Sequence, residues 1–263
     1  MYISASFIDV KKHQDYADFS NVPEYQTLVL CDGIGEFEMS RDISEFTVHQ
    51  ILKKSYKTLK ELILDGELEI KKKSGLIAGT TVIQAYIPKN SNKVKIEYLG
   101  NGGIIHLPGD FGSLPNSTYP YRYNEVMLPH IAPNGALTRH ISHHSSKQEL
   151  APGEFEIKMN HPAGDILLFF TDGISALEDK VILKDDMGRF WRNEPETIQL
   201  ILQELNSFLK HTRDLLHFQD RLVDFNNSVL KKLKESNMLE DDASLGIIVS
   251  EDVLNNLMVL END

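Results

Sequence analysis

Residues 166–173 read Ile-Leu-Leu-Phe-Phe-Thr-Asp-Gly, a short unbroken apolar run that ends in a carboxylate and a glycine. A run of large apolar residues that is too short for a helix is typical of a strand buried on both faces. The side chain at the end of such a strand has little conformational freedom, as a metal or catalytic site requires. The stretch therefore predicts a central strand with a candidate functional carboxylate, Asp172, at its end.

Two other carboxylates occupy similar positions. Residues 28–33, Leu-Val-Leu-Cys-Asp-Gly, end in Asp32 and Gly33, and Asp241 lies shortly before the apolar run 245–249. A glycine after the carboxylate lets the chain turn sharply and leaves a backbone carbonyl free to coordinate a cation. One Asp-Gly pair after a strand is ordinary turn chemistry. Three carboxylates at strand ends together favour a metal site.

Further strand-like runs lie before, between and after these stretches. They are rich in β-branched and aromatic residues and are bounded by Gly, Pro or Asn. In 94–98, Val-Lys-Ile-Glu-Tyr, apolar and polar residues alternate as in a half-buried strand. The predicted strands are 27–31, 80–87, 94–99, 103–107, 155–159, 166–171 and 244–250.

Two stretches show helical periodicity instead. Apolar residues from Phe46 to Ile63 form one stripe, with lysines largely on the opposite face, and predict a helix. A longer stripe from Ile198 to Leu233 exceeds an ordinary helix and predicts two helices that pack on the core, with part of the stripe open to use as a dimer seam. Grouped strands with segregated helices favour an α+β layered sandwich over a doubly wound sheet.

The chain is expected to form one domain over residues 1–263, because no repeat or linker divides it. Residues 108–153 are rich in Pro, Gly, Ser, Asn and His and predict an irregular, flap-like insertion. Within it, His140, His143 and His144 favour a solvated or substrate-facing loop over a zinc site, because no carboxylate lies between them as in the HExxH motif.

Composition excludes several classes of protein. Of the 263 residues, 27 are Lys or Arg and 39 are Asp or Glu, which gives a net charge of −12. Nucleic-acid binding is not expected without a dominant basic stripe. Membrane insertion is not expected either, because the apolar runs are far too short to span a bilayer. The single cysteine, Cys31, and the start of the chain, which lacks a signal-peptide pattern, predict a reducing, cytoplasmic location.

Six short motifs follow one another in a fixed order along the chain. They are HQDYA at 13–17, CDGIG at 31–35, GTT at 79–81, LGNGG at 99–103, FTDG at 170–173 and DDAS at 241–244. The series resembles the metal-dependent serine/threonine phosphatases of the PPM family, also called type 2C. The motifs of that family read (N)(E/Q)DA, DGxG, G(S/T)T, GDSR, (S/T)DG and D(N/D)(I/A)(T/S), in the same order.

The resemblance implies a four-layer α-β-β-α sandwich with two central antiparallel sheets and two Mn²⁺ or Mg²⁺ ions at one end of the strands. Asp32 matches the carboxylate that bridges the metals, and Gly33 matches the residue that offers its carbonyl to the second metal. Asp172 and Asp241 match further ligands of the first metal, and Asp15 matches the acidic residue that engages metal-bound water. The implied reaction is attack of a metal-bound hydroxide on phosphoserine or phosphothreonine in a protein substrate.

This chain also departs from the family pattern. Asn101 and Ala176 stand where many members have carboxylates of a third, weaker metal site, so that site is expected to be absent or altered. The same loss resembles the bacterial regulatory branch, the sporulation and sigma-factor-pathway phosphatases. Val10 stands where a phosphate-binding arginine often lies, and Lys11 or Lys12 could replace that arginine without its bidentate geometry.

These departures leave a second reading open, a pseudophosphatase that binds a phosphoprotein without turnover. The three retained metal carboxylates favour the enzyme, because a binding module has no need of them. A catalytic role for Cys31 is not expected. The cysteine-dependent phosphatases require an arginine six residues after the nucleophile, and this chain has Phe37 there.

Overall fold

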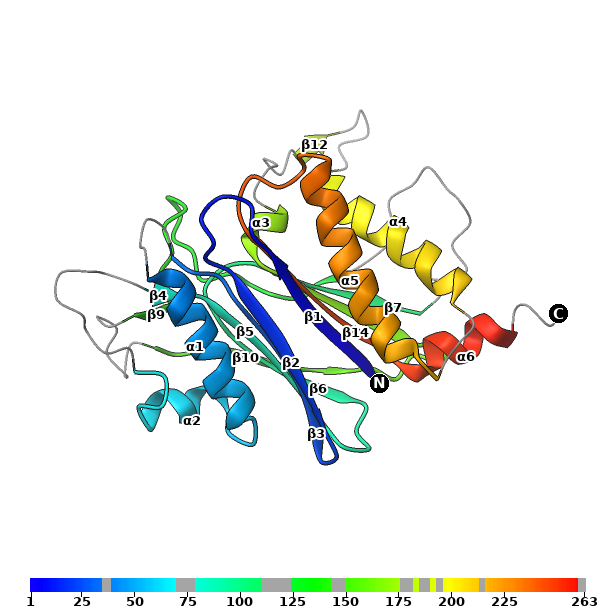
Figure 1. The fold of residues 1–263 in the computed structure, drawn as a ribbon, viewed down its shortest axis with the longest axis horizontal. Coiled ribbons are helices and arrows are strands. Elements are labelled where there is room, and N and C mark those ends of the chain that lie inside the picture. The colour runs from blue at the N-terminus through cyan, green and yellow to red at the C-terminus, as the bar shows by residue number, and fades with distance from the viewer. Residues whose placement is uncertain are drawn as a thin grey trace.

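Two five-stranded antiparallel sheets form the centre of the protein, and helices cover their outer faces (Figure 1). The strand order is β1-β14-β11-β7-β8 in the first sheet and β10-β6-β5-β3-β2 in the second. Apolar side chains of both sheets pack against each other between the layers. The layers therefore run helix, sheet, sheet, helix, which confirms the predicted α+β sandwich with two central antiparallel sheets.

The computed structural model describes residues 1–34, 39–69, 79–109, 124–142, 150–175, 182–184, 190–192, 196–212 and 216–259. The first sheet consists of β1 (Tyr2–Ile8), β14 (Ala243–Val249), β11 (Asp165–Phe170), β7 (Gly103–Pro108) and β8 (Asn124–Glu125). The second consists of β10 (Gly153–Lys158), β6 (Lys93–Leu99), β5 (Val82–Pro88), β3 (Tyr25–Cys31) and β2 (Tyr16–Val22). Two short pairs are β4 (Gly79–Thr80) with β9 (Ile141–Ser142), and β12 (Ile182–Lys184) with β13 (Phe190–Arg192). The described helices are α1 (Ser40–Lys53), α2 (Leu59–Leu64), α3 (Asp172–Ser175), α4 (Glu196–His211), α5 (Phe218–Glu235) and α6 (Glu251–Val259).

The unbroken apolar run in β11 is explained by burial of both of its faces. Leu167 and Phe169 pack between the two sheets, whereas Ile166, Leu168 and Phe170 pack under the helices. Every residue of β11 is buried. Because successive side chains point to opposite faces, the strand is fixed on both sides, and the residues that follow it start from a rigid position.

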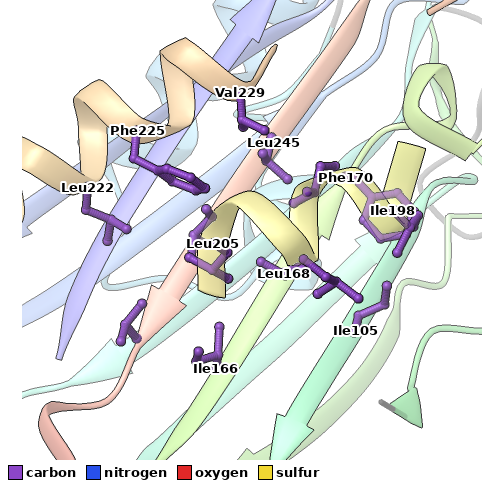
Figure 2. Close-up of a cluster of buried hydrophobic side chains, with 14 of the residues drawn as sticks. Ile105, Ile166, Leu168, Phe170, Ile198, Leu205, Leu222, Phe225, Val229 and Leu245 are labelled. Carbon is purple, nitrogen blue, oxygen red and sulfur yellow. The ribbon is translucent and has the colours of Figure 1, made fainter. Parts of the chain in front are cut away.

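Helices α4 and α5 cover the first sheet, as Figure 2 shows for the cluster around Leu205 and Phe225. α4 ends at His211 and α5 begins at Phe218. The prediction of two helices in 198–233 is therefore confirmed. Both helices place their apolar stripe on the sheet, so the stripe serves core packing.

The predicted helix over 46–63 is divided into two. α1 ends at Lys53 and α2 begins at Leu59, after a capping box in which Thr58 and Glu61 bond each other's backbone N–H groups. The pattern Thr-x-x-Glu is typical of such a capping box at the N-terminus of a helix. Phe46, expected on the buried stripe, is 39% exposed. The face of α1 that packs on the second sheet is built from Val48 and Ile51 together with small polar residues.

Strands are present in all seven predicted regions, but the predicted strand 80–87 is divided between β4 and β5, which lie in different sheets. The long strands β1 and β2, and the short strands β8, β9, β12 and β13, were not expected from the sequence. β1 contains the small polar residues Ser4 and Ser6, both buried, so its periodicity is weak. Of the predicted flap at 108–153, residues 110–123 and 143–149 lie outside the described residues. Residues 124–142 add β8 to the edge of the first sheet and pair β9 with β4. Over the described ranges, no helix is long and apolar enough to cross a membrane.

Candidate metal and catalytic site

Four carboxylates from distant parts of the sequence meet at one end of the two sheets. Asp15 precedes β2, Asp32 follows β3, Asp172 follows β11 and Asp241 lies just before β14. Because neighbouring strands are antiparallel, the start of one strand lies beside the end of the next. The Asp32 carboxyl lies within hydrogen-bond reach of both Asp15 and Asp172. We call these four residues the acidic cluster.

The backbone at Asp32 is fixed by Thr80 at the end of β4 and by Thr81, which lies between β4 and β5. The Asp32 carbonyl accepts hydrogen bonds from Thr81 N (2.8 Å) and Thr80 Oγ1 (3.0 Å), and Asp32 N donates to Thr81 Oγ1 (3.2 Å). A Cβ on Gly33 would lie 2.6 Å from Ser40 Cβ and 2.9 Å from Gln14 Cβ, so only glycine fits here. Burial and the neighbouring Asp15 and Asp172 carboxylates raise the pKa of Asp32 well above its usual range.

Asp15 is the most deeply buried member of the cluster, with 1% of its surface exposed. Its Oδ2 accepts hydrogen bonds from Thr171 Oγ1 (2.7 Å) and Ser244 Oγ (2.9 Å), and Ser244 N donates to Thr171 Oγ1 (2.8 Å). These two hydroxyls lie at the junction of β11 and β14 and fix the Asp15 carboxyl beside Asp32. Burial raises the pKa of Asp15 to about 7, although the hydrogen bonds act in the opposite direction.

Asp172 begins the short helix α3 and is held by the loop before β7. Asn101 Nδ2 donates to Asp172 Oδ2 at 2.5 Å. Burial raises the pKa of Asp172, while hydrogen bonds from Asp32 and Asn101 act against this. A Cβ on Gly173 would lie 1.9 Å from the carbonyl oxygen of Asp242, so this glycine allows the chain after β11 to approach the chain before β14. The close approach brings Asp172 and Asp241 together.

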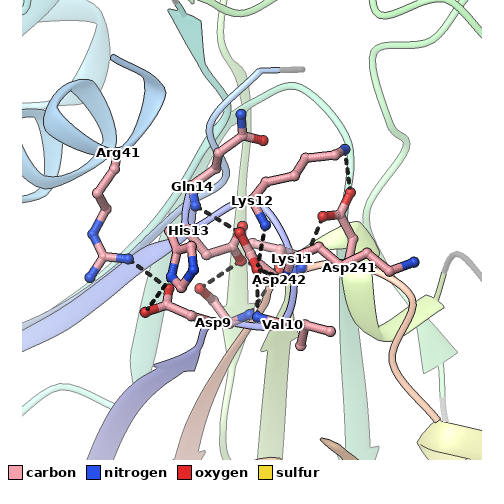
Figure 3. Close-up of polar contacts among 12 residues, drawn as sticks. Asp9, Val10, Lys11, Lys12, His13, Gln14, Arg41, Asp241 and Asp242 are labelled. Carbon is pink, nitrogen blue, oxygen red and sulfur yellow. Dashed lines mark hydrogen bonds and ion pairs between the residues drawn. The ribbon is translucent and has the colours of Figure 1, made fainter. Parts of the chain in front are cut away.

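Asp241 forms an ion pair with Lys12 from the loop between β1 and β2 (Figure 3). Lys12 Nζ lies 2.7 Å from Asp241 Oδ2. The adjacent Asp242, 3% exposed, accepts hydrogen bonds from the backbone N–H groups of that loop at Val10 (2.6 Å), Lys11 (2.9 Å), Lys12 (3.3 Å) and Gln14 (2.7 Å). Asp242 thus holds the loop against the acidic cluster, a role that the sequence reading missed.

Val10 stands where the PPM family often has a phosphate-binding arginine, and its backbone N–H group is bound by Asp242. Val10 lies in the loop that Asp242 holds. Two cations from other elements contact this loop at Asp9. Lys234 of α5 donates to the Asp9 carbonyl oxygen (2.6 Å). Arg41 of α1 forms an ion pair with the Asp9 carboxylate (2.9 Å) and stacks over the Phe7 ring at 4.4 Å from the ring centre. Arg41 therefore helps to hold the end of β1.

Cys31 and the histidines of the predicted flap were the alternative candidates for a catalytic or metal site. Cys31 is fully buried in β3, and burial raises the pKa of its thiol well above its ordinary value, so a reactive thiolate is not favoured. His140 lies beside Gly79 and is half-buried, and burial lowers its pKa. Phe37, His143, His144 and Ala176 lie outside the described residues.

The donor atoms of the cluster suit a hard divalent cation such as Mg²⁺ or Mn²⁺, which prefers carboxylate and carbonyl oxygens. The positive charge of Lys12 interacts with three of the four carboxylates, Asp32, Asp172 and Asp241. In the described part of the chain, however, no three His, Cys, Asp or Glu side chains already converge as a metal-ligand group. Instead, Asn101 holds Asp172 and Lys12 holds Asp241. The oxygen ligands suit these metals, and the two donors would have to move away from Asp172 and Asp241 before both carboxylates could bind a cation.

Comparison with known proteins detects similarity in structure and not in sequence. No protein-family model matches the chain, and no curated protein matches it. A serine/threonine phosphatase from S. agalactiae has a TM-score of 0.61 at 15% identity, over 93% of this chain and 97% of that chain. The serine/threonine phosphatase Stp1 from Staphylococcus aureus has a TM-score of 0.56 at 16% identity, over 95% of this chain and 96% of that chain.

A third similar structure contains the RsbU and RsbW domains of a Mycobacterium tuberculosis protein, with a TM-score of 0.55 at 16% identity. The similarity covers 93% of this chain and 58% of that one. The two phosphatase matches cover almost the whole of this chain and of the other chain. The chain therefore has the fold of the bacterial PPM serine/threonine phosphatases.

Proposed function

We propose that this protein is a metal-dependent protein phosphatase that acts on phosphoserine or phosphothreonine. The observation that carries the proposal is the acidic cluster, in which Asp15, Asp32, Asp172 and Asp241 meet at one end of the two sheets. A buried group of like charges is costly in a protein that has no cation to bind there. The similarity to bacterial serine/threonine phosphatases in fold supports the same class of reaction.

Asp32, the carbonyl of Gly33, Asp172 and Asp241 would hold two Mn²⁺ or Mg²⁺ ions. When bound, such ions supply Lewis acidity, which acidifies a water molecule and neutralises the phosphoryl oxygens. Asp32 is suited to a shared position because it lies within reach of both Asp15 and Asp172. Its backbone is fixed by Thr80 and Thr81, so the carboxylate is oriented in advance.

Asp15 is suited to orient water and to hold its proton. Its Oδ2 is fixed by the hydroxyls of Thr171 and Ser244, which leaves the carboxyl aligned beside Asp32. Bound cations beside it would favour the charged form of the Asp15 carboxylate, which could then accept a proton from water. No side-chain nucleophile is required, because water attacks phosphorus.

The proposal is tested by removing the metal. Purified protein should release phosphate from a phosphoserine peptide with Mn²⁺ or Mg²⁺, lose this activity in excess EDTA, and regain it when the cation is restored. Loss without recovery would point to denaturation, so circular dichroism is recorded in parallel. Full activity in EDTA, after metal removal has been verified by elemental analysis, would contradict the proposal.

A second candidate function is a pseudophosphatase that binds a phosphoprotein. Asn101 in place of a carboxylate and the Lys12–Asp241 ion pair favour it, because both occupy metal-ligand oxygens with protein donors. Measuring phosphopeptide binding and phosphate release side by side distinguishes the two functions. Stable binding of phosphoserine peptides with no phosphate release at saturating Mn²⁺ would establish the pseudophosphatase.

A further inference from the structure

The ion pair between Lys12 and Asp241 places a positive charge of the protein itself at the acidic cluster. The two charged atoms are 2.7 Å apart, and the side chains are 45% and 35% exposed. The ammonium group of Lys12 also interacts electrostatically with Asp32 and Asp172. Lys12 therefore contacts one candidate metal ligand and lies close to two others.

Lys12 is held in this position by its backbone. Asp242 accepts hydrogen bonds from the N–H groups of Val10, Lys11 and Lys12, which fixes the loop and leaves the Lys12 side chain aligned with Asp241 (Figure 3). Lys11 belongs to the same loop and makes the same kind of backbone contact. Within the described residues its ammonium group forms no ion pair. The two neighbouring lysines thus differ in their relation to the acidic cluster.

We propose that Lys12 is a built-in competitor of the divalent cation, which neutralises Asp241 in the metal-free protein and must leave Asp241 when metal binds. This inference rests on the metal centre of the proposed function. A carboxylate that is paired with an ammonium group has to give up that partner before it can serve a metal. An interaction that stabilises only the metal-free state lowers metal affinity by the same factor by which it stabilises that state.

Removal of the Lys12 charge should therefore strengthen metal binding. In titration calorimetry with Mn²⁺, Lys12→Met should bind about fivefold more tightly than the wild type, the upper end for a partly exposed ion pair. Lys12→Arg keeps the charge and should bind as the wild type does. Lys11→Met is the matched control, since it removes the adjacent charge and leaves the ion pair with Asp241 in place. Equal strengthening by both methionine variants would reveal a long-range charge effect and overturn the proposal.

Thermal unfolding gives a second readout that is independent of activity. In EDTA, Lys12→Met should unfold at a lower temperature than the wild type, and saturating Mn²⁺ should remove the difference. Tighter Mn²⁺ binding without phosphate release by any variant would contradict the proposed function and leave this inference intact. Equal Mn²⁺ affinity of the wild type and Lys12→Met would overturn this inference alone. Failure of all variants to bind Mn²⁺ would overturn both.

Discussion

Asp242 determines the shape of the loop between β1 and β2 with a single carboxylate. Burial alone would raise its pKa, but hydrogen bonds from four backbone N–H groups hold the pKa of Asp242 below its usual value. A buried backbone N–H group that loses its acceptor lowers the free energy of unfolding. The residue therefore contributes both to stability and to the position of Lys12 and Asp15, which lie in or next to the loop.

We predict that Asp242→Ala lowers the free energy of unfolding by about 3 kcal/mol, because several charge-assisted hydrogen bonds are lost together. Asp242→Asn keeps one carbonyl acceptor and should cost about 1 kcal/mol. Urea denaturation of both variants in EDTA measures the difference. Equal stability of Asp242→Ala and the wild type would show that the loop does not depend on this carboxylate.

Substitution of Cys31 distinguishes a water nucleophile from a cysteine nucleophile. It is fully buried in β3, next to Asp32 in sequence, and its thiol contacts Thr80. Because water is the expected nucleophile, Cys31→Ser should retain phosphatase activity within about tenfold. The measurement is phosphate release at saturating Mn²⁺. A complete loss of activity in a folded, metal-loaded variant would favour a cysteine mechanism instead.

At the scale of elements, Glu97 of β6 connects the second sheet to α2. Its Oε2 accepts the N–H group of Leu59 at 2.7 Å, at the start of the helix. Burial raises the pKa of Glu97, and hydrogen bonds from the backbone of Leu59 and Lys60 act against this. A carboxyl whose pKa is raised by folding stabilises the protein fully at pH values below the pKa of the unfolded chain. That contribution is lost as pH rises through the pKa of the folded protein.

We therefore predict that Glu97→Gln becomes more stable relative to the wild type as pH rises from about 4 to about 7. Glutamine keeps an oxygen that can accept from Leu59 and carries no charge at any pH. Chemical denaturation at a series of pH values measures the difference, with Glu24→Gln in the exposed turn between β2 and β3 as the control. A difference that is constant over this range, or that reverses, would contradict the assignment.

The elements that could be predicted from sequence are those whose side chains carry a strong apolar pattern. β11 is apolar from Ile166 to Phe170, since both of its faces are buried. β1 was missed because small polar residues occupy buried positions there, where the adjacent strand and α5 leave little room. The break between α1 and α2 could have been found, because Thr58 and Glu61 form a capping box that is legible in the sequence.

At the scale of the whole molecule, the order of the six motifs predicted the fold. Antiparallel pairing of the strands explains how these motifs, which are distant in sequence, come together. The four carboxylates are spread in sequence from Asp15 to Asp241, yet each lies near a strand terminus at the same end of the two sheets. What could not be predicted is the set of partners of each carboxylate. Asn101 and Lys12 reach the cluster through loop conformations, which depend on contacts such as those of Asp242 and not on local sequence pattern.

For the proposed phosphatase activity, the acidic cluster has to hold metal during turnover. Asp32 is the member that lies within reach of both Asp15 and Asp172, so it is the residue whose charge two cations would share. Asp32→Asn replaces this charge with a neutral and poorer ligand. Asp18→Asn in β2 makes the same chemical change at a carboxylate that accepts a hydrogen bond from Phe19 N and is not a member of the cluster.

The most direct measurement is the rate of phosphate release from a phosphoserine peptide at saturating Mn²⁺ for the wild type and these two variants. We predict that Asp32→Asn lowers turnover by at least ~100-fold, the scale seen when an electrostatic group in contact with the reacting atoms is removed. Asp18→Asn should retain the wild-type rate. Release of phosphate by Asp32→Asn at the wild-type rate, with all three proteins folded, would contradict the account.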